Sequence, residues 1–264
     1  MSLFKVVPLP PSRFPLAVSR QSLAAEMGKA LLEIKAHSRF NDEGDDSLKL
    51  PRKYWEPIPC YHYEDGRPRK YTDGAFRVIG EKSPSKALAS LVSSKANNRL
   101  ECGSTVLASI YLGLVRLLGP EGFDHIFSRR LVAIAPLNVS LTRVGCKEFT
   151  CDHPFFRLLT QSTGETKVER IQAGDIVYFR NYDRYEELCP DGAFAGEWTI
   201  CVRHQPIPVF NCFGIEGDLD ANSVKDVLRE KYKHDTGQRK TPGGRPTIDE
   251  VFRPDLSKLG IELT

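Results

Sequence analysis

Cys102 lies in the segment "NNRLECGSTVLASIYLGLVRLLGP", at the point where a long apolar helix is predicted to begin. The free N–H groups and partial positive charge at the start of a helix favour a thiolate. The backbone amides of Cys102 and Gly103 would be placed to hold an oxyanion, as in cysteine hydrolases and acyltransferases. Cysteine is also among the residues most often buried in cores. The segment alone therefore fits both a reactive and a structural thiol.

Two polar residues further along the chain are candidate partners of this cysteine. Glu197 opens the strand pattern "GEWTICV", in which residues 197, 199 and 201 alternate with the apolar residues 198, 200 and 202. A carboxylate at that place could act as a general base or acid, and a solvated strand end is the alternative. Asn211 interrupts the apolar run "VFNCFGI". Its pattern alone indicates a turn, a bulge or a hydrogen-bonded polar position.

Helical periodicity dominates the elements that precede and follow the cysteine. Residues 20–40 have helical spacing, and Ser83 as N-cap with Pro84 at the first helical position predicts a second, short helix. The helix that begins at Cys102 is apolar on nearly all faces, which predicts a buried central helix. Gly119 and the proline after it are expected to end that helix.

The second half of the chain changes to strand-like runs rich in β-branched and aromatic residues. A helix returns at residues 221–235, with Asn222 or Ser223 as the predicted N-cap, and residues 247–261 form a short closing element. Helices followed by antiparallel-looking strands predict an α+β fold. We divide the chain into an N-terminal arm at 1–74, a catalytic core at 75–235 and a basic linker with a tail at 236–264.

Composition narrows the function classes. The chain has 37 basic and 34 acidic residues, a net charge of +3 that is too mild to indicate a nucleic-acid partner. Four prolines and several charges interrupt the first twenty residues, so we expect no cleavable signal peptide, and no apolar run has the length of a membrane span. The oligomeric state cannot be read from the composition.

The seven cysteines are odd in number and include no Cys-x-x-Cys pair. Cys146, Cys151 and His153 match none of the usual zinc spacings, and we expect neither a metal nor an organic cofactor. Reduced thiols in a cytoplasmic compartment are the expected state, and non-classical export as an effector is compatible with this.

Several motifs follow one another between residues 75 and 230: Pro84-Ser85-Lys86-Ala87, Glu101-Cys102, Gly119 with Phe123 and Phe127, a strand with Gly174, Asp175, Tyr178, Phe179 and Asn181, and Gly196-Glu197. In order and rough spacing they resemble the small Tgl-like transglutaminases of spore-forming bacilli, which are protein-glutamine γ-glutamyltransferases. Agreement of several motifs in one order is far more specific than any single motif. The arm at residues 1–70 matches this family poorly.

The resemblance implies a papain-like or NlpC/P60-like core, with the nucleophile at the start of a central helix packed on an antiparallel sheet. It assigns Cys102 as the nucleophile and Glu197 as the catalytic acid, and we expect Glu101 to assist. The implied reaction moves the acyl group of a protein glutamine side chain to a lysine amine through a Cys102 thioester. The expected partners are proteins with accessible glutamine and lysine side chains.

One residue departs from the family pattern. The family carries a histidine that faces the cysteine on the strand after its catalytic glutamate, and Asn211 stands at that position here. A Cys102–Glu197 dyad could suffice, with Asn211 holding the polar geometry. Alternatively His204 or His153 could reach the site, or the chain could be a catalytically inactive binding protein. A glutamine deamidase or cysteine protease that uses the same cysteine is a further alternative.

Overall fold

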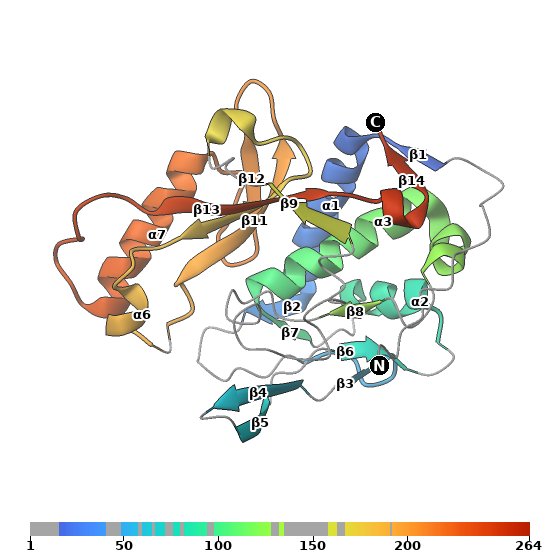
Figure 1. The fold of residues 1–264 in the computed structure, drawn as a ribbon, viewed down its shortest axis with the longest axis horizontal. Helices are drawn as coiled ribbons and strands as arrows, with labels where there is room; N and C mark the ends of the chain where they lie inside the picture. The colour runs from blue at the N-terminus through green and yellow to red at the C-terminus, as the bar shows by residue number, and fades with distance from the viewer. Residues whose placement is uncertain are drawn as a thin grey trace.

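The computed structural model describes residues 16–40, 49–57, 60–64, 67–71, 76–79, 82–93, 98–127, 132–134, 158–162, 167–190 and 192–264. Within these ranges, a pair of long helices packs on one face of a five-stranded sheet, and a third helix covers the other face (Figure 1).

The helix pair consists of α1 (Arg20–His37) and α3 (Cys102–Ile126). The helix predicted at residues 20–40 is thus confirmed over residues 20–37, whereas residues 38–40 form a short strand. The α3 helix is buried along most of its length, as its apolar faces predict. Gly119 has φ 72° and ψ 158° and interrupts α3, after which the helix resumes at Pro120. The predicted end is therefore a break between two helical segments. Gly113 lies against Met27, which brings the two helix backbones close together.

By length and composition alone, α3 could cross a membrane. Of its most apolar 18-residue window, 67% is buried inside the fold against other elements. A core helix of a globular protein has this pattern, because its apolar surface is covered by the rest of the chain.

The main sheet is antiparallel throughout, with the strand order β12-β11-β10-β13-β9. Its strands are β9 (Leu159–Gln161), β10 (Ile176–Arg180), β11 (Gly196–Arg203), β12 (Val209–Cys212) and β13 (Thr247–Pro254). Trp198 and Ile200 face the helix pair, whereas Cys201 joins the core under α7 (Ala221–Thr236). The α+β class, with a helix packed on an antiparallel sheet, is confirmed.

Short strands surround this core. Two parallel pairs are formed by β1 (Leu16–Val18) with β14 (Ile261–Leu263) and by β2 (Ser38–Phe40) with β7 (Asn98–Leu100). A three-stranded antiparallel sheet consists of β3 (Trp55–Pro57), β6 (Phe76–Val78) and β8 (Ala133–Ile134). A hairpin is formed by β4 (Cys60–Glu64) and β5 (Arg67–Tyr71). The short helical elements are α2 (Pro84–Ala89), η1 (Ser90–Val92), η2 (Val168–Arg170), α6 (Tyr185–Leu188) and η3 (Ser257–Leu259).

Two expectations for the C-terminal part change. The N-cap of α7 is Asp220, whose side chain accepts a hydrogen bond from the Ser223 N–H at 2.7 Å, and not Asn222 or Ser223. Residues 247–254, which we expected in a tail, form β13 between β10 and β9. α1 packs against α3 and β11, and β13 pairs with β10 and β9.

Candidate active site

The amino end of α3 is organised by the carboxylate of Glu101. Glu101 has extended backbone angles and is the N-cap of the helix. One of its oxygens, Oε2, accepts the Gly103 N–H at 2.8 Å, and Oε1 accepts the Ser104 N–H. The Ser104 hydroxyl closes a capping box by accepting the Glu101 N–H at 3.2 Å. Glu101 is therefore held rigidly beside the cysteine.

Cys102 occupies the first turn of α3 and is half-buried. Its Sγ lies 3.7 Å from Oε2 of Glu101 in donor geometry. Burial raises the pKa of the thiol well above its ordinary value, and the negative charges of Glu197 and Glu101 raise it further. Hydrogen bonds from the backbone of Trp198 and Gly103 oppose this effect. The resting site therefore holds a neutral thiol with two carboxyl groups beside it.

Glu197, at the start of β11, is fully buried. Its Oε1 accepts the Gly214 N–H at 3.1 Å, and Oε2 has no hydrogen-bond partner among the described residues. Burial raises the pKa of this carboxyl group to about 8, and the charge of Glu101 adds to the rise. The backbone groups of Gly214 and Phe213 and the charge of Lys35 partly offset it. The structure thus brings three predicted residues together: Glu101, Cys102 and Glu197.

Gly103, one of the two expected oxyanion donors, already donates its N–H to Glu101. The Trp198 backbone, which the sequence did not single out, also forms a hydrogen bond to the Cys102 thiol. It belongs to the strand that carries Glu197, and the packing of β11 against the start of α3 brings it to the thiol.

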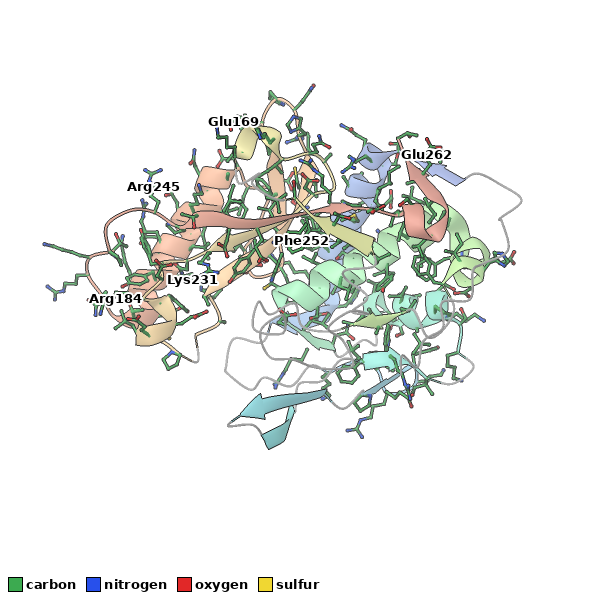
Figure 2. The ribbon with its side chains drawn as sticks, in the orientation of Figure 1. Glu169, Arg184, Lys231, Arg245, Phe252 and Glu262 are labelled. Carbon is green, nitrogen blue, oxygen red and sulfur yellow. The ribbon has the colours of Figure 1, made fainter. Side chains whose placement is uncertain are left out.

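Tyr178 and Trp198 form an aromatic wall next to the cysteine. Their ring centroids are 4.9 Å apart, and the ring centroid of Phe252 lies 5.8 Å from that of Trp198. Figure 2 labels Phe252, which belongs to β13. Burial raises the pKa of Tyr178, and the charge of Cys102 contributes to this shift. Gly196 leaves room for this arrangement, because a Cβ there would lie 2.2 Å from the Tyr178 hydroxyl oxygen.

Lys35 was also missed by sequence reasoning. It lies near the end of α1, and its Nζ donates to the Ile215 carbonyl oxygen at 2.9 Å and pairs with Glu216 at 3.0 Å. A lysine on the polar side of an amphipathic helix carries no signal of such a role. Lys35 also acts on the buried thiol of Cys212. Burial and the charge of Glu197 raise the pKa of this thiol, and the positive charge of Lys35 partly offsets the rise.

Asn211 does not join this group. It is 4% exposed, stands opposite Ile200 on the face that meets the helix pair, and its Nδ2 is 3.4 Å from the place that a Cβ on Gly28 would occupy. Within the described residues its Oδ1 has no hydrogen-bond partner, and no hydrogen bond connects Asn211 with Cys102 or Glu197. Asn211 therefore faces α1, and no contact among the described residues supports its assignment as a catalytic residue.

Of the two histidines proposed as alternatives, His204 lies within the described residues and His153 does not. His204 follows the far end of β11, seven residues after Glu197, which corresponds to about 23 Å along an extended strand. This separation removes His204 from the neighbourhood of the cysteine. His153 lies outside the described residues, as do Cys146 and Cys151. Among the described residues, no group of histidine, cysteine and acidic side chains is arranged to hold a metal ion.

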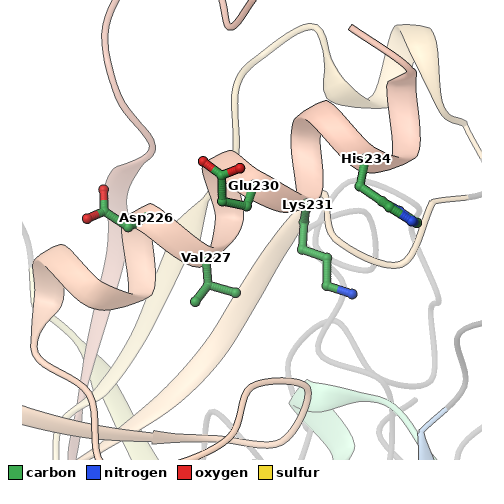
Figure 3. Close-up of a pocket in the computed structure, with 5 residues that line it drawn as sticks. All are labelled: Asp226, Val227, Glu230, Lys231 and His234. Carbon is green, nitrogen blue, oxygen red and sulfur yellow. The ribbon is translucent and has the colours of Figure 1, made fainter. Parts of the chain in front are cut away.

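A surface hollow of about 430 Å³ lies on the outer side of α7, away from these residues (Figure 3). Its lining consists of Asp226, Val227, Glu230, Lys231 and His234. All five come from a single helix on the opposite side of the sheet from α1 and α3. The hollow therefore has no part in the Cys102 site.

Comparison with known proteins relates this arrangement to one fold. No protein-family model matches the sequence, and no curated protein sequence matches it. Among solved structures, a transglutaminase from Geobacillus stearothermophilus, without its C-terminal extension, superposes with a TM-score of 0.61. The match covers 92% of this chain and 97% of that protein at 15% sequence identity. The resemblance that the motifs indicate is thereby confirmed at the level of the fold, which is that of a bacterial transglutaminase.

Proposed function

We propose that the chain is a cysteine-dependent acyltransferase of the transglutaminase type, which joins protein glutamine side chains to lysine amines. One observation carries the proposal. A fully buried carboxyl group with a pKa of about 8, that of Glu197, lies in electrostatic contact with a cysteine at the start of the central helix. The fold that surrounds this pair is shared with a transglutaminase over 92% of the chain. We also propose that the nucleophile is placed relative to the sheet as it is in papain-like enzymes.

In the first half of the reaction, Sγ of Cys102 attacks the γ-carboxamide carbon of the glutamine substrate. Glu197 takes the thiol proton and passes it to the departing nitrogen, so that ammonia leaves and a γ-glutamyl thioester forms. The backbone N–H groups of Cys102 and Trp198 would stabilise the oxyanion. Gly103 could contribute only if its N–H were released by Glu101.

In the second half, a lysine amine attacks the thioester carbon. The amine loses a proton to the carboxylate, the C–S bond breaks, and the thiolate is reprotonated. An isopeptide bond forms, and the enzyme returns to its resting state. Water in place of the amine would give glutamate, which is the deamidation reaction.

The test is incubation of the protein with a glutamine-containing protein and a fluorescent primary amine at pH 8.5. We expect covalent incorporation of the amine, and its loss in Cys102→Ala. Cys189→Ala is the matched control, because Cys189 is a half-buried free cysteine at the end of α6 and should leave the rate unchanged.

The products separate the alternatives. Ammonia release without amine incorporation would indicate a deamidase, and cleavage of the substrate backbone would indicate a protease. A Cys102→Ala protein with full activity would refute a cysteine mechanism. If the wild-type protein modifies no glutamine-containing substrate at all, an inactive binding protein becomes the better interpretation.

A further inference from the structure

The carboxyl group of Glu197 depends on a short segment of backbone, residues 213–216, that follows β12. The Gly214 N–H donates to Oε1 at 3.1 Å, and the Phe213 backbone also forms a hydrogen bond to this carboxyl group. These bonds fix one carboxyl oxygen and leave Oε2, which has no partner among the described residues, as the oxygen able to exchange a proton. The placement of residues 213–216 therefore determines where this oxygen points.

Lys35 of α1 holds this segment. Its Nζ donates to the Ile215 carbonyl oxygen at 2.9 Å and contacts Oε1 of Glu216 at 3.0 Å. The Lys35 side chain is 18% exposed, whereas that of Glu216 is 89% exposed. The bond to the carbonyl oxygen is thus the sheltered contact of this lysine, and the ion pair is open to solvent and weak.

We propose that Lys35 is a positioning residue for the acyl-transfer reaction, because it holds residues 213–216 against Glu197 and places a positive charge near that carboxyl group. The inference rests on the proposed function. It adds a residue from α1, outside the segment in which the transglutaminase motifs lie.

Within the part of the chain that the structure describes, the charged and titratable groups around Glu197 come from three other elements. Glu101 at the start of α3 opposes ionisation of the Glu197 carboxyl group, and Lys35 of α1 favours it. The negative charge of Glu197 raises the pKa of two thiols, those of Cys102 on α3 and Cys212 on β12. Among the described residues Lys35 is the one cation in this group, so its removal leaves acidic groups and neutral thiols around Glu197. The pKa of Glu197 must then rise.

The test measures the protonation of Glu197 directly, by infrared difference spectra of the carboxylic acid C=O band between pH 5 and pH 10. The band is assigned by its absence in Glu197→Gln. We expect Lys35→Met to move the titration midpoint upward by roughly one pH unit, as expected for the loss of one nearby opposite charge. Lys35→Arg should return the midpoint most of the way to that of the wild type, because it restores the charge.

Lys29→Met is the matched control, since Lys29 is on the same helix, is 64% exposed and forms an ion pair with the neighbouring Glu26. It should leave the midpoint unchanged. The rate of amine incorporation at pH 7 should fall about tenfold in Lys35→Met and recover in Lys35→Arg. A lysine that only stabilises the fold would lower the melting temperature without moving the midpoint.

An unchanged midpoint in folded Lys35→Met protein would overturn the proposal. The proposed function fails separately, since it fails if the wild-type protein incorporates no amine, whatever the infrared midpoint does. A shift in Lys29→Met equal to that in Lys35→Met would also overturn the proposal, because the effect would then come from the net charge of the protein.

Discussion

At the scale of single residues, the protonation state of Glu197 governs the expected pH dependence. The carboxylate form must accept the thiol proton, and burial holds the pKa of this group at about 8. Below pH 8 the protonated form dominates, so kcat/KM should rise with pH and level off above about pH 9. The measurement is the initial rate of amine incorporation from pH 6 to pH 10.

Glu197→Gln should remove this rise and lower kcat/KM by roughly 10²- to 10⁴-fold, the usual contribution of a general acid–base group. Glu187→Gln, an exposed carboxylate on α6, serves as the control and should keep the wild-type profile. A rate that still rises through pH 8 in Glu197→Gln would assign the proton transfer to another group.

Sequence reasoning named the two residues that we propose to react, but few of their contacts. Cys102 and Glu197 stand in short motifs, which a linear pattern can carry. Glutamate is not among the preferred N-cap residues, so the capping role of Glu101 had no signal. The Lys35 hydrogen bond connects residues 180 positions apart in the chain and exists only once α1 packs beside β12. Asn211 was assigned by alignment with the family histidine, and its contact with α1 could not be foreseen from that alignment.

At the scale of elements, the position of Cys102 depends on how closely α1 and α3 approach each other. A Cβ on Gly113 of α3 would lie 3.0 Å from Cγ and 3.2 Å from the backbone nitrogen of Met27. The side chain can move, but the backbone of α1 cannot move without shifting the helix. Gly113→Ala should therefore reduce the free energy of unfolding by about 1–3 kcal/mol, the usual cost of overpacking.

Gly122→Ala, in the same helix, is the matched control. Its Cβ would meet only the Leu118 side chain, at an ordinary 3.6 Å. Alanine is the better helix former, so we expect this change to stabilise the protein by up to about 1 kcal/mol. Urea denaturation of both variants at pH 7 provides the comparison. Equal effects of the two substitutions would show that the helix contact is not limiting.

The boundaries of these elements were predicted to different degrees. Ser83 and Pro84 are a strong local start signal, and α2 begins at Pro84 with the Ser83 side chain accepting the Lys86 N–H at 3.2 Å. Asp220 was missed as the cap of α7 because Asn222 and Ser223, which follow closely, are equally suitable residue types. Local sequence thus identified the helix but not which polar residue faces its first free amides.

At the scale of the whole molecule, local sequence patterns do not predict the order of the strands in the sheet. The alternation in β10 and β11 predicts two strands, but nothing in residues 247–254 indicates that they enter the sheet beside β10. Such pairing joins residues far apart in the chain and is decided by the packing of the entire core. The two ends of the described chain also pair although they are far apart in sequence. The Arg20 N–H donates to the Thr264 carbonyl oxygen at 2.8 Å, and β1 pairs with β14.

Asp175 is the charged residue that ties these distant segments to the sheet. It precedes β10 and its side chain is fully buried, 3.6 Å from Nη1 of Arg20 at the start of α1 and 3.3 Å from Nε of Arg253 on β13. The Gln172 N–H donates to the same carboxylate at 2.8 Å. A single carboxylate thus connects the first helix, the sheet and its C-terminal strand.

Asp175→Asn should lower the free energy of unfolding by about 3 kcal/mol, because two guanidinium groups lose their buried counter-charge. Both arginine side chains keep about a quarter of their surface exposed, which limits the loss. Asp249→Asn is the matched control, since Asp249 pairs with Arg180 at 2.6 Å but both partners are about one-third exposed, so about 1 kcal/mol or less is expected. Urea denaturation at pH 7 measures both values. If Asp175→Asn costs no more than Asp249→Asn, the buried carboxylate does not hold the terminal segments, and the β1–β14 pairing must do so instead.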